Sequence, residues 1–382
     1  MFSIGGNTAW VPSRSYFRIG VRLQGPLAVP PVLANQIAFA NFCPGNLFDN
    51  CLFLAGGQDV SSIVNYAPQA HACKYRLKKS GAWLSTIGKD AFGISSNYQH
   101  RRNQAATDGD LGVDAGHNLP LDDHGQNIVY FMYQPPIGIS DHSKPIGAGE
   151  YRYQFNPNTN YKTACVESTV LKAAGTFDFI VDTMELYIYT QKMDISPTGT
   201  DVLQLMEHQV QSKTLSGAGE FNLDFSIPTS TKAITVFVQS NTAGTDTRVP
   251  PSNFKCIAGQ DVTLQSLQLT YSNITKPPTR WTSEYNVNTN KLQQRYLDTQ
   301  IESGQAFSSG GSETFKQWYD SGPIYHYSWL RDKDDRSSQL QLQINYRAME
   351  QNANLFIVAH FSREIQMQIQ NGFIVNVTSS TV

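Results

Sequence analysis

The sequence is short of charge. Asp, Glu, Lys and Arg make up 16% of its 382 residues, against about 25% in an ordinary soluble domain. The 29 basic and 31 acidic residues give a formal net charge of -2, so no global field attracts a phosphate backbone. Gln, Asn, Ser and Thr supply the polar character instead. Because a hydrogen-bonded amide costs far less to bury than an ion, this composition favours a surface that neighbours largely cover.

Paired cysteines and long apolar runs are also lacking. The five cysteines (Cys43, Cys51, Cys73, Cys165 and Cys256) are odd in number and form no CxxC pair. This argues against a disulfide framework and a structural zinc site, so we expect reduced core thiols and no cofactor. The start, MFSIGGNTAWVPS, lacks the pattern of a secretory signal, and no apolar run approaches the roughly 18 residues of a membrane helix. A soluble protein made inside the cell is expected.

Strand-like segments recur along the whole chain. They are short, rich in Val, Ile, Phe, Tyr and Thr, and separated by Gly, Pro, Asn or Ser, which is typical of antiparallel all-β folds. They cover residues 15–23, 35–42, 127–134, 151–155, 176–192, 220–228, 232–240, 261–271, 338–347, 354–361 and 364–377. Helix signals are few: residues 291–300 predict one short helix, and residues 312–322 predict a second that begins at an N-cap, Ser312, and stops at Gly322.

One break near the midpoint divides the chain. ISPTGTDV (195–202) follows a strong strand and precedes a new set of strands, so we expect two β-sandwiches in tandem, each with the roughly eight strands of a jelly roll. The predicted parts are an N-terminal arm over residues 1–14, a first jelly roll over 15–198 with a long loop at about 93–126, and a second over 199–382 with a long loop at about 272–323.

A ladder of glutamines marks the second half. In SQLQLQINYR (338–347), apolar residues take one parity and amides the other, as in a β-strand with one buried face. The segment 364–370 repeats this pattern. A strand that faces bulk water usually carries charge, so we interpret the amide face as a contact with another barrel or subunit. The interface candidates are Gln339, Gln341, Gln343, Gln366, Gln368 and Gln370.

One loop gathers possible metal ligands. DGDLGVDAGHNLPLDDHG (108–125) offers the cation candidates Asp108, Asp110, Asp114, Asp122, Asp123 and His124. The EF-hand spacing fails, because Leu119 stands where that pattern needs a carboxylate. Gly, Asp and Asn are also the residues with which a solvated loop turns. No metal is therefore assigned, and a structural cation is the more credible version of a site here.

The remaining candidate chemistry has an ordinary structural explanation beside it. The basic stretches 74–79 and 100–102 could meet phosphate, but they also suit a solvated or interface face. An aromatic group (325–329, Trp281, Trp318 and Tyr319) could form a carbohydrate platform, although such residues more often anchor a core. His208, His326 and His360 are interpreted as structural residues. No GxSxG elbow or nucleophile constellation is present, so no catalytic residue is predicted.

The order of segments in the second half resembles a known family. Residues 221–240, 248–255, 267–285, 292–299, 309–329, 335–346 and 354–365 are similar to major capsid proteins of polinton-like viruses and virophages. In the first half, residues 53–67, 151–171 and 183–192 carry the resemblance. It therefore covers most of the chain from about residue 150 onward.

The resemblance implies a double jelly-roll capsid protein of the lineage shared with adenovirus hexon and tailless membrane-containing phages. Such proteins form homotrimers with a hexagonal outline that tile an icosahedral shell around a double-stranded DNA genome. The implied partners are neighbouring capsomers, penton and minor capsid proteins and an internal membrane, with no direct sequence-specific nucleic acid. The expected place is the virion capsid, assembled inside the host cell, and no enzyme activity is implied. A carbohydrate-binding β-sandwich module and a metal-dependent β-sandwich enzyme stay open as alternatives.

Overall fold

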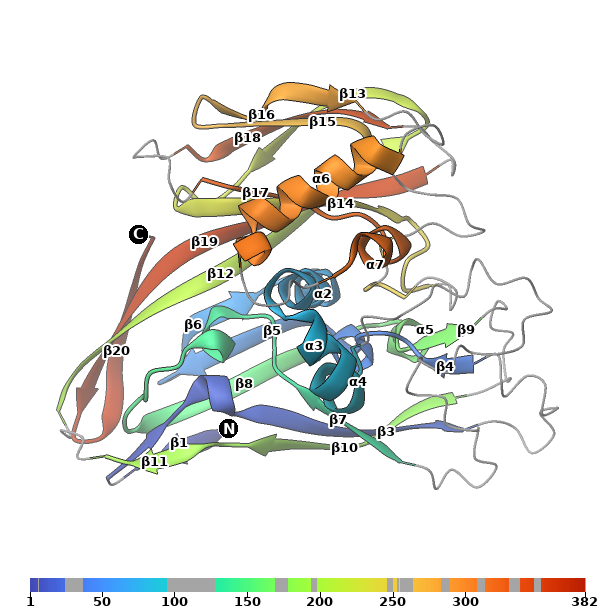
Figure 1. Cartoon of the computed structure of the whole chain (residues 1–382). Coiled ribbons are helices and arrows are strands. Elements are labelled where there is room, and N and C mark those ends of the chain that lie inside the picture. The colour runs from blue at the N-terminus through green and yellow to red at the C-terminus, as the bar shows by residue number, and fades with distance from the viewer. Residues whose placement is uncertain are drawn as a thin grey trace.

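Antiparallel strands form most of the molecule in a computed structural model of the chain (Figure 1). The structure describes residues 1–5, 7–24, 37–94, 128–168, 178–193, 198–245, 250–252, 254, 264–282, 289–307, 313–329, 337–346 and 352–381. Within these ranges, each sheet takes its strands either from residues up to 192 or from residues 199 onward. The two halves of the chain thus build separate sets of sheets.

The first half forms two main sheets and two short strand pairs. One sheet has the order β1 (Phe2–Ile4), β8 (Gly149–Pro157), β5 (Phe48–Ala55) and β6 (Gln58–Ile63); the other has the order β10 (Asp178–Tyr187), β3 (Tyr16–Gln24) and β7 (Val129–Tyr133). The short pairs are β11 (Thr190–Lys192) with β2 (Thr8–Trp10), and β4 (Ile37–Phe39) with β9 (Val166–Ser168). Between the strands lie η1 (Pro12–Arg14), η2 (Cys43–Leu47), α2 (Ala67–Lys78), α3 (Gly81–Trp83), η3 (Leu84–Gly88), α4 (Lys89–Phe92), η5 (Gly138–Asp141) and α5 (Tyr161–Ala164).

Aromatic side chains fill the space between these two sheets. Phe17 of β3 meets Tyr153 and Phe155 of β8 edge-on, each with ring centroids 5.1 Å apart. Phe48 packs on the Phe155 ring at 4.6 Å. Such ring pairs add to the apolar area that is buried. The alternation of strand residues therefore places one face of each sheet in a shared core.

Residues 1–14, expected as an N-terminal arm, pair with strands of the first half. Phe2 lies opposite Tyr151 in the β1–β8 ladder, and Trp10 lies opposite Thr190 in the β2–β11 ladder. The Trp10 side chain is fully buried and donates to Ser15 Oγ. Phe2 and Trp10 thus anchor this segment in the core of its own chain.

The second half forms a sandwich of two larger sheets. The first has the order β12 (Gly199–Ser216), β19 (Asn352–Gln370), β14 (Thr231–Ser240) and β17 (Tyr325–Ser328), with β20 (Phe373–Thr381) paired to β19. The second has the order β13 (Gly219–Ser226), β18 (Gln339–Tyr346), β15 (Leu264–Tyr271) and β16 (Ile274–Thr282). The helices of this half are α6 (Thr289–Glu302), η7 (Gln305–Phe307) and α7 (Phe315–Asp320).

The strand pairs of each half are nested. In the second half, β12 pairs with β19, β13 with β18, β14 with β17 and β15 with β16. In the first half, β3 pairs with β10, β4 with β9 and β5 with β8. A long antiparallel hairpin that rolls up into two facing sheets gives this nesting, which is the jelly-roll arrangement. The all-β fold class predicted from the sequence is confirmed, and both halves are jelly rolls.

Most predicted strands are present, but several strands were not predicted. The predicted segments correspond to β3, β4, β7, β8, β10, β11, β13, β14, β15, β18, β19 and β20. The strands β1, β2, β5, β6, β9, β12, β16 and β17 had no counterpart in the prediction. The second predicted long loop, 272–323, therefore contains a sheet strand, β16, as well as α6 and α7. The first lies almost wholly outside the described residues.

Three strands of the second half extend over the first. Beyond its pairing with β14, the last part of β19 continues between β12 and β20. There Arg363 donates to the Val60 carbonyl of β6, and the Val377 amide of β20 donates to Gln58 Oε1. Figure 1 shows β12, β19 and β20 running from the second half down along the first. This three-stranded extension ties the two jelly rolls together.

Candidate functional site

A group of buried polar side chains lies where the two halves meet. We call this region the junction: α2, β6 and η5 of the first half face β12, β14, β17, β19 and the α7 region of the second half. Of the twelve residues of α2, Ala67 to Leu77 are buried, so this helix packs on nearly every side. In Figure 1, α2 lies between the sheets of the two halves.

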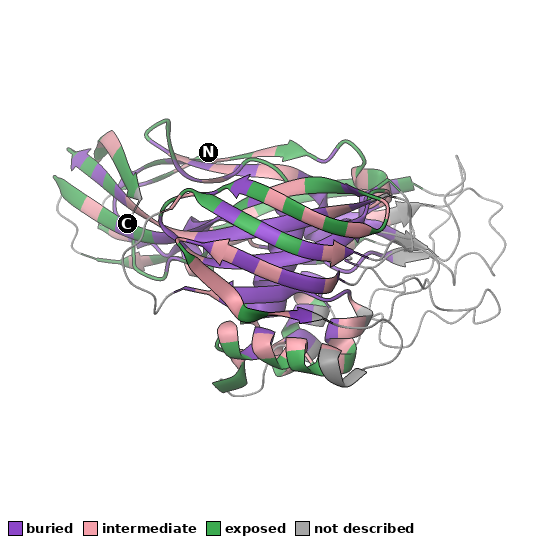
Figure 2. Cartoon of the chain, turned by 90° about the horizontal axis from the view of Figure 1, so that it is seen from above, coloured by how far each residue is buried: buried purple, intermediate pink, exposed green. Residues whose placement is uncertain are grey.

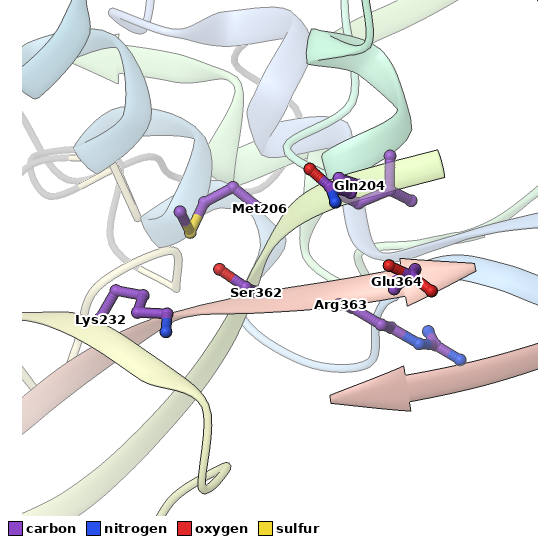
Figure 3. A pocket seen from close by; sticks show the side chains of 7 residues that line it. Gln204, Met206, Lys232, Ser362, Arg363 and Glu364 are labelled. Atoms are coloured by element: carbon purple, nitrogen blue, oxygen red, sulfur yellow. The ribbon is translucent and has the colours of Figure 1, made fainter. Parts of the chain in front are cut away.

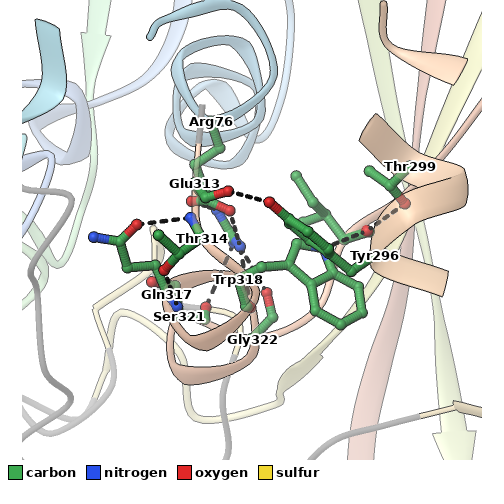
Figure 4. A network of polar contacts seen from close by, with 10 residues as sticks. Arg76, Tyr296, Thr299, Glu313, Thr314, Gln317, Trp318, Ser321 and Gly322 are labelled. Carbon is green, nitrogen blue, oxygen red and sulfur yellow. Dashed lines mark hydrogen bonds and ion pairs between the residues drawn. The ribbon is translucent and has the colours of Figure 1, made fainter. Parts of the chain in front are cut away.

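Arg76 of α2 clamps the α7 region (Figure 4). Its Nε lies 2.6 Å from Glu313 Oε1 and its Nη2 lies 3.1 Å from Oε2, so the ion pair is bidentate. Nη2 also donates to the carbonyls of Trp318 and Gly322, at 3.4 and 2.9 Å. The Arg76 and Glu313 side chains are 3% and 7% exposed. A buried pair needs such complete hydrogen bonding to offset its desolvation.

The α7 turn is built to present these groups. Thr314 is the N-cap, and it forms a capping box with Gln317: the Gln317 amide donates to Thr314 Oγ1, and the Thr314 amide donates to Gln317 Oε1. The sequence placed the N-cap two residues earlier, at Ser312, which is wrong. The helix was predicted correctly, and its stop at Gly322 is confirmed by that residue's positive φ of 87°.

Three histidines from separate strands form a hydrogen-bonded row. His208 Nδ1 of β12 lies 3.0 Å from His360 Nδ1 of β19. His360 Nε2 lies 2.8 Å from the Thr235 hydroxyl of β14, which lies 2.9 Å from His326 Nδ1 of β17. We call these four residues the histidine row. Burial lowers the pKa of His208 to about 3 and that of His326 to about 4, and it lowers the pKa of His360 well below its usual value. The imidazoles are neutral near pH 7.

Two lysines and one aspartate of the first half face this row. Lys74 Nζ lies 2.9 Å from Asp141 Oδ1, and Lys78 Nζ lies 3.3 Å from Oδ2. Burial alone would raise the pKa of Asp141, but Lys74 and Lys78 more than offset it and hold the pKa well below its usual range. Burial lowers the pKa of Lys74, and Asp141 partly counteracts that effect. The stretch 74–79, predicted as a phosphate-contact, solvated or interface face, instead buries Lys74 and Arg76 within the chain.

Glu207 is a buried carboxyl beside the row. Its side chain accepts from the Ser61 hydroxyl at 2.5 Å and from the Gly138 amide at 3.1 Å. A Cβ at position 138 would stand 2.8 Å from Glu207 Oε1, so glycine allows this close approach. Burial raises the pKa of Glu207 to about 7, although both hydrogen bonds and Arg363 act in the opposite direction.

Glu207→Gln is expected to remove a pH-dependent cost. The pKa of Glu207 is about 7 in the folded state against 4.5 for a free carboxyl. The stability that its bound proton gives the folded state is therefore fully present below pH 4.5 and is lost as the pH rises through 7, where burying the ionised carboxylate costs free energy. Between pH 6 and pH 8, the stability of the variant relative to the wild type should therefore rise by about 1.4 kcal/mol. Urea unfolding at the two pH values measures this. Glu150→Gln, at an exposed carboxyl, should show no such change; an equal change in both variants contradicts the assignment.

One open pocket lies beside the junction (Figure 3). It has a volume of about 310 Å³ and is lined by Gln204, Leu205, Met206, Lys232, Ser362, Arg363 and Glu364. Arg363 already donates to Val60 O, and Glu364 accepts from Gln366. Two of its charged groups are thus used inside the chain, and the pocket presents no constellation for catalysis.

Both glutamine ladders are exposed in the single chain. Gln339, Gln341 and Gln343 alternate on β18 with three buried residues, Leu340, Leu342 and Ile344, and Figure 2 shows this alternation on the outer sheet. Gln341 lies between Asp224 and Thr270, and Gln343 lies between Asn222 and Gln268. The second ladder, Gln366, Gln368 and Gln370, is exposed on the part of β19 that extends over the first half. The predicted faces exist; what covers them stays a prediction.

The cation candidates, the aromatic group and the cysteines singled out in the sequence differ in how the structure places them. The cation candidates Asp108, Asp110, Asp114, Asp122, Asp123 and His124 lie outside the described residues. Trp281, Trp318, Tyr325, Tyr327 and Trp329 are buried, so these rings anchor the core, which was the more frequent role expected of them, and do not form an exposed carbohydrate platform. Cys43, Cys51, Cys73 and Cys165 are buried free thiols, as predicted; Cys256 is not described. In the described ranges, no three His, Cys, Asp or Glu side chains are arranged so that they could hold a metal ion, and no helix is long and apolar enough to cross a membrane.

Two nested jelly rolls in one chain define the double jelly-roll class of proteins. The whole chain superposes on a chain of the cryo-EM structure of the Sputnik virophage, with a TM-score of 0.60, 13% identity and 84% of that chain covered. It also superposes over its full length on the mavirus major capsid protein, with a TM-score of 0.58, 11% identity and 86% of that chain covered. The chain also superposes on VP54 of PBCV-1, as fitted into a cryo-EM reconstruction of Sputnik, with a TM-score of 0.53, 12% identity and 92% of that chain covered. No known family and no curated protein matches the sequence. These likenesses establish the fold.

Proposed function

We propose that this chain is the major capsid protein of a double-stranded DNA virus and acts by geometry and not by catalysis. The observation that carries the proposal is the double jelly roll itself, shared over the full chain with the mavirus major capsid protein. Two similar sandwiches in one chain allow three chains to approximate a hexagon. Such capsomers tile an icosahedral facet, and the virion would be the place where the protein acts.

Each jelly roll is assigned a residue range, and their exposed strands are the proposed contact surfaces. The first jelly roll takes residues 15–198 and the second takes 199–382, with the junction as the rigid connection between them. Exposed apolar side chains on β10, including Val181 and Met184 at 39% each, support a lateral contact there, because β10 ends its sheet. The amide faces of β18 and β19 support further contacts with neighbouring subunits. Penton and minor capsid proteins are the remaining expected partners.

Oligomeric state tests the proposal directly. We expect the purified chain to elute as a particle of three chain masses by multi-angle light scattering, and negative-stain images to show a hexagonal outline. A strict monomer at micromolar concentration would overturn it. Stoichiometric transition metal that is lost on Asp122→Ala with His124→Ala would instead favour the metal-dependent enzyme.

A further inference from the structure

Strand β20 ends the three-stranded extension with an unprotected edge. Among the described strands it pairs only with β19, and its residues, FIVNVTSST, include no charge and no proline. An open edge presents a row of unpaired main-chain donors and acceptors, so monomeric proteins normally protect it with charge, proline or a covering element. The composition of β20 therefore leaves its edge open to another strand.

The other strands that end the sheets of the second half are protected. Strand β17 is covered by α6, whose Thr299 and Glu302 side chains accept from the amides of His326 and Ser328. Charged residues or prolines mark the rest: Asp201, Glu207 and Lys213 on β12, Glu220 and Asp224 on β13, and Lys276, Pro277, Pro278 and Arg280 on β16. Among the edge strands described in this half, β20 is therefore the one that neither charge, proline nor a helix protects.

The open part of the β20 edge is centred on Ser379. Near the turn the register shifts by one residue, and beyond it the Val377 amide points away from β19 and donates to Gln58 Oε1 at 3.2 Å. Because residues two apart in a strand point their main-chain groups to the same side, the amide and carbonyl of Ser379 also point outward. Thr378, Ser379 and Ser380 are exposed. Gln58 thus covers the first part of the edge, and the part around Ser379 stays accessible in the described chain.

The absence of charge favours a second copy of the same chain as the partner. A twofold antiparallel pair places each strand against its own sequence, so a charge at its centre would face a like charge. An edge that selects a different strand has no such restriction, because that strand can carry the opposite charge. The residues of β19 that pair with the end of β20 include Arg363 and Glu364, whose charges are opposite in sign. The surroundings of Ser379 are therefore balanced in charge as well.

We propose that β20 pairs antiparallel with β20 of a second copy, centred on Ser379, so that the extensions of two copies form one continuous sheet. The Ser379 amide of each copy donates to the Ser379 carbonyl of the other. The inference goes beyond the proposed function: between capsomers this contact would join one trimer to the next, and in a chain that does not form trimers it would give a dimer. Such a contact is weak between two chains and gains strength where many copies meet.

A cysteine at the centre of the pair tests its register. Ser379→Cys should form a disulfide-linked pair of chains under mild oxidation, because directly opposite residues in a hydrogen-bonded antiparallel pair have Cα atoms about 5.5 Å apart, within disulfide reach. Thr279→Cys, at an exposed position of the protected β16 edge, should stay unlinked. Non-reducing gels compare the two variants, and the wild type gives the background from the native cysteines.

Proline tests whether main-chain pairing holds the copies together. Ser379→Pro removes an outward amide and leaves the β19 ladder intact. It should weaken association roughly tenfold or more, since two hydrogen bonds are lost per pair. Ser379→Ala keeps the amide and should associate as the wild type does. Sedimentation velocity across a dilution series follows dimers of the chain or, where trimers form, pairs of trimers. If Ser379→Pro does not fold, Ser379→Lys, which places two ammonium groups opposite each other, should weaken association in its place.

The outcomes separate this pairing from the proposed function. Trimer mass should be the same in the wild type and in every Ser379 variant, so a missing trimer with intact β20 pairing counts against the capsid proposal only. Equal association of Ser379→Pro and Ser379→Ala would overturn the pairing. So would a Ser379→Cys chain that links no more than Thr279→Cys does, which is the result expected if a strand of a different protein occupies this edge.

Discussion

Arg76→Met is expected to lower the free energy of unfolding by about 3–5 kcal/mol. The substitution leaves the Glu313 carboxylate, whose side chain is 7% exposed, without its bidentate partner. It also removes the donor to the carbonyls of Trp318 and Gly322 at the end of α7. A buried charge without a partner costs far more than a lost surface contact. Urea unfolding followed by tryptophan fluorescence measures the loss, since Trp318 lies inside the clamp.

Two companion variants give this result its meaning. Arg76→Met combined with Glu313→Met should cost clearly less than the sum of the single substitutions, because neither charge is left alone. Arg18→Met breaks an ion pair with Glu185 whose side chains are 43% and 49% exposed, so water screens the pair and its loss should cost far less than Arg76→Met does. If Arg76→Met and Arg18→Met cost the same, the clamp does not stabilise the junction.

The sequence predicts a strand best when one of its faces is exposed to solvent and the other is buried. In β18, Leu340 and Leu342 are fully buried between exposed glutamines, and this period of two is visible without a structure. Helix α7 was found for the related reason that its ends carry turn and capping residues. Local chemistry therefore fixes these elements before any tertiary contact forms.

Helix α2 and strand β12 escaped prediction because neither has a regular hydrophobic period. Helix α2 has no polar stripe, because Ala67 to Leu77 are all buried, and an amphipathic period is what reveals a helix. Its Lys74 and Arg76 resemble a surface patch in sequence, yet each pairs with a carboxylate from another element. In β12 the buried parity changes between Glu207 and His208, so the strand shows no sustained alternation.

The junction could not be predicted because its parts are distant in sequence. His208, His326 and His360 were each interpreted as structural residues, and all three are buried, but nothing in a linear pattern places them in one row. Strand nesting brings them together: His208 lies opposite His360 in the β12–β19 ladder, and Thr235 lies opposite His326 in the β14–β17 ladder. Only the register of the sheets brings these three histidines within hydrogen-bond distance of one another or of Thr235.

The glutamine ladder gives the prediction with the largest effect on assembly. Gln341→Lys with Gln343→Lys should leave the fold of the single chain within about 0.5 kcal/mol of the wild type, because both side chains are exposed. In a shell, however, these positions would lose water, and an unpaired ammonium is costly to bury where an amide can pair. We expect roughly hundredfold weaker association of trimers or arrays, which corresponds to about 3 kcal/mol. Sedimentation velocity across a dilution series measures it.

A matched pair of lysines distinguishes the face from net charge. Gln293→Lys with Gln294→Lys adds the same two charges to exposed positions of α6, so it changes the global field as much but leaves the β18 face unaltered. If only the β18 pair weakens association, the amide face is an interface in which charge cannot be tolerated. Equal weakening by both pairs would trace the effect to net repulsion. If neither pair changes association, the β18 face is exposed to solvent in the assembly, and the low charge of this sequence needs a different physical cause.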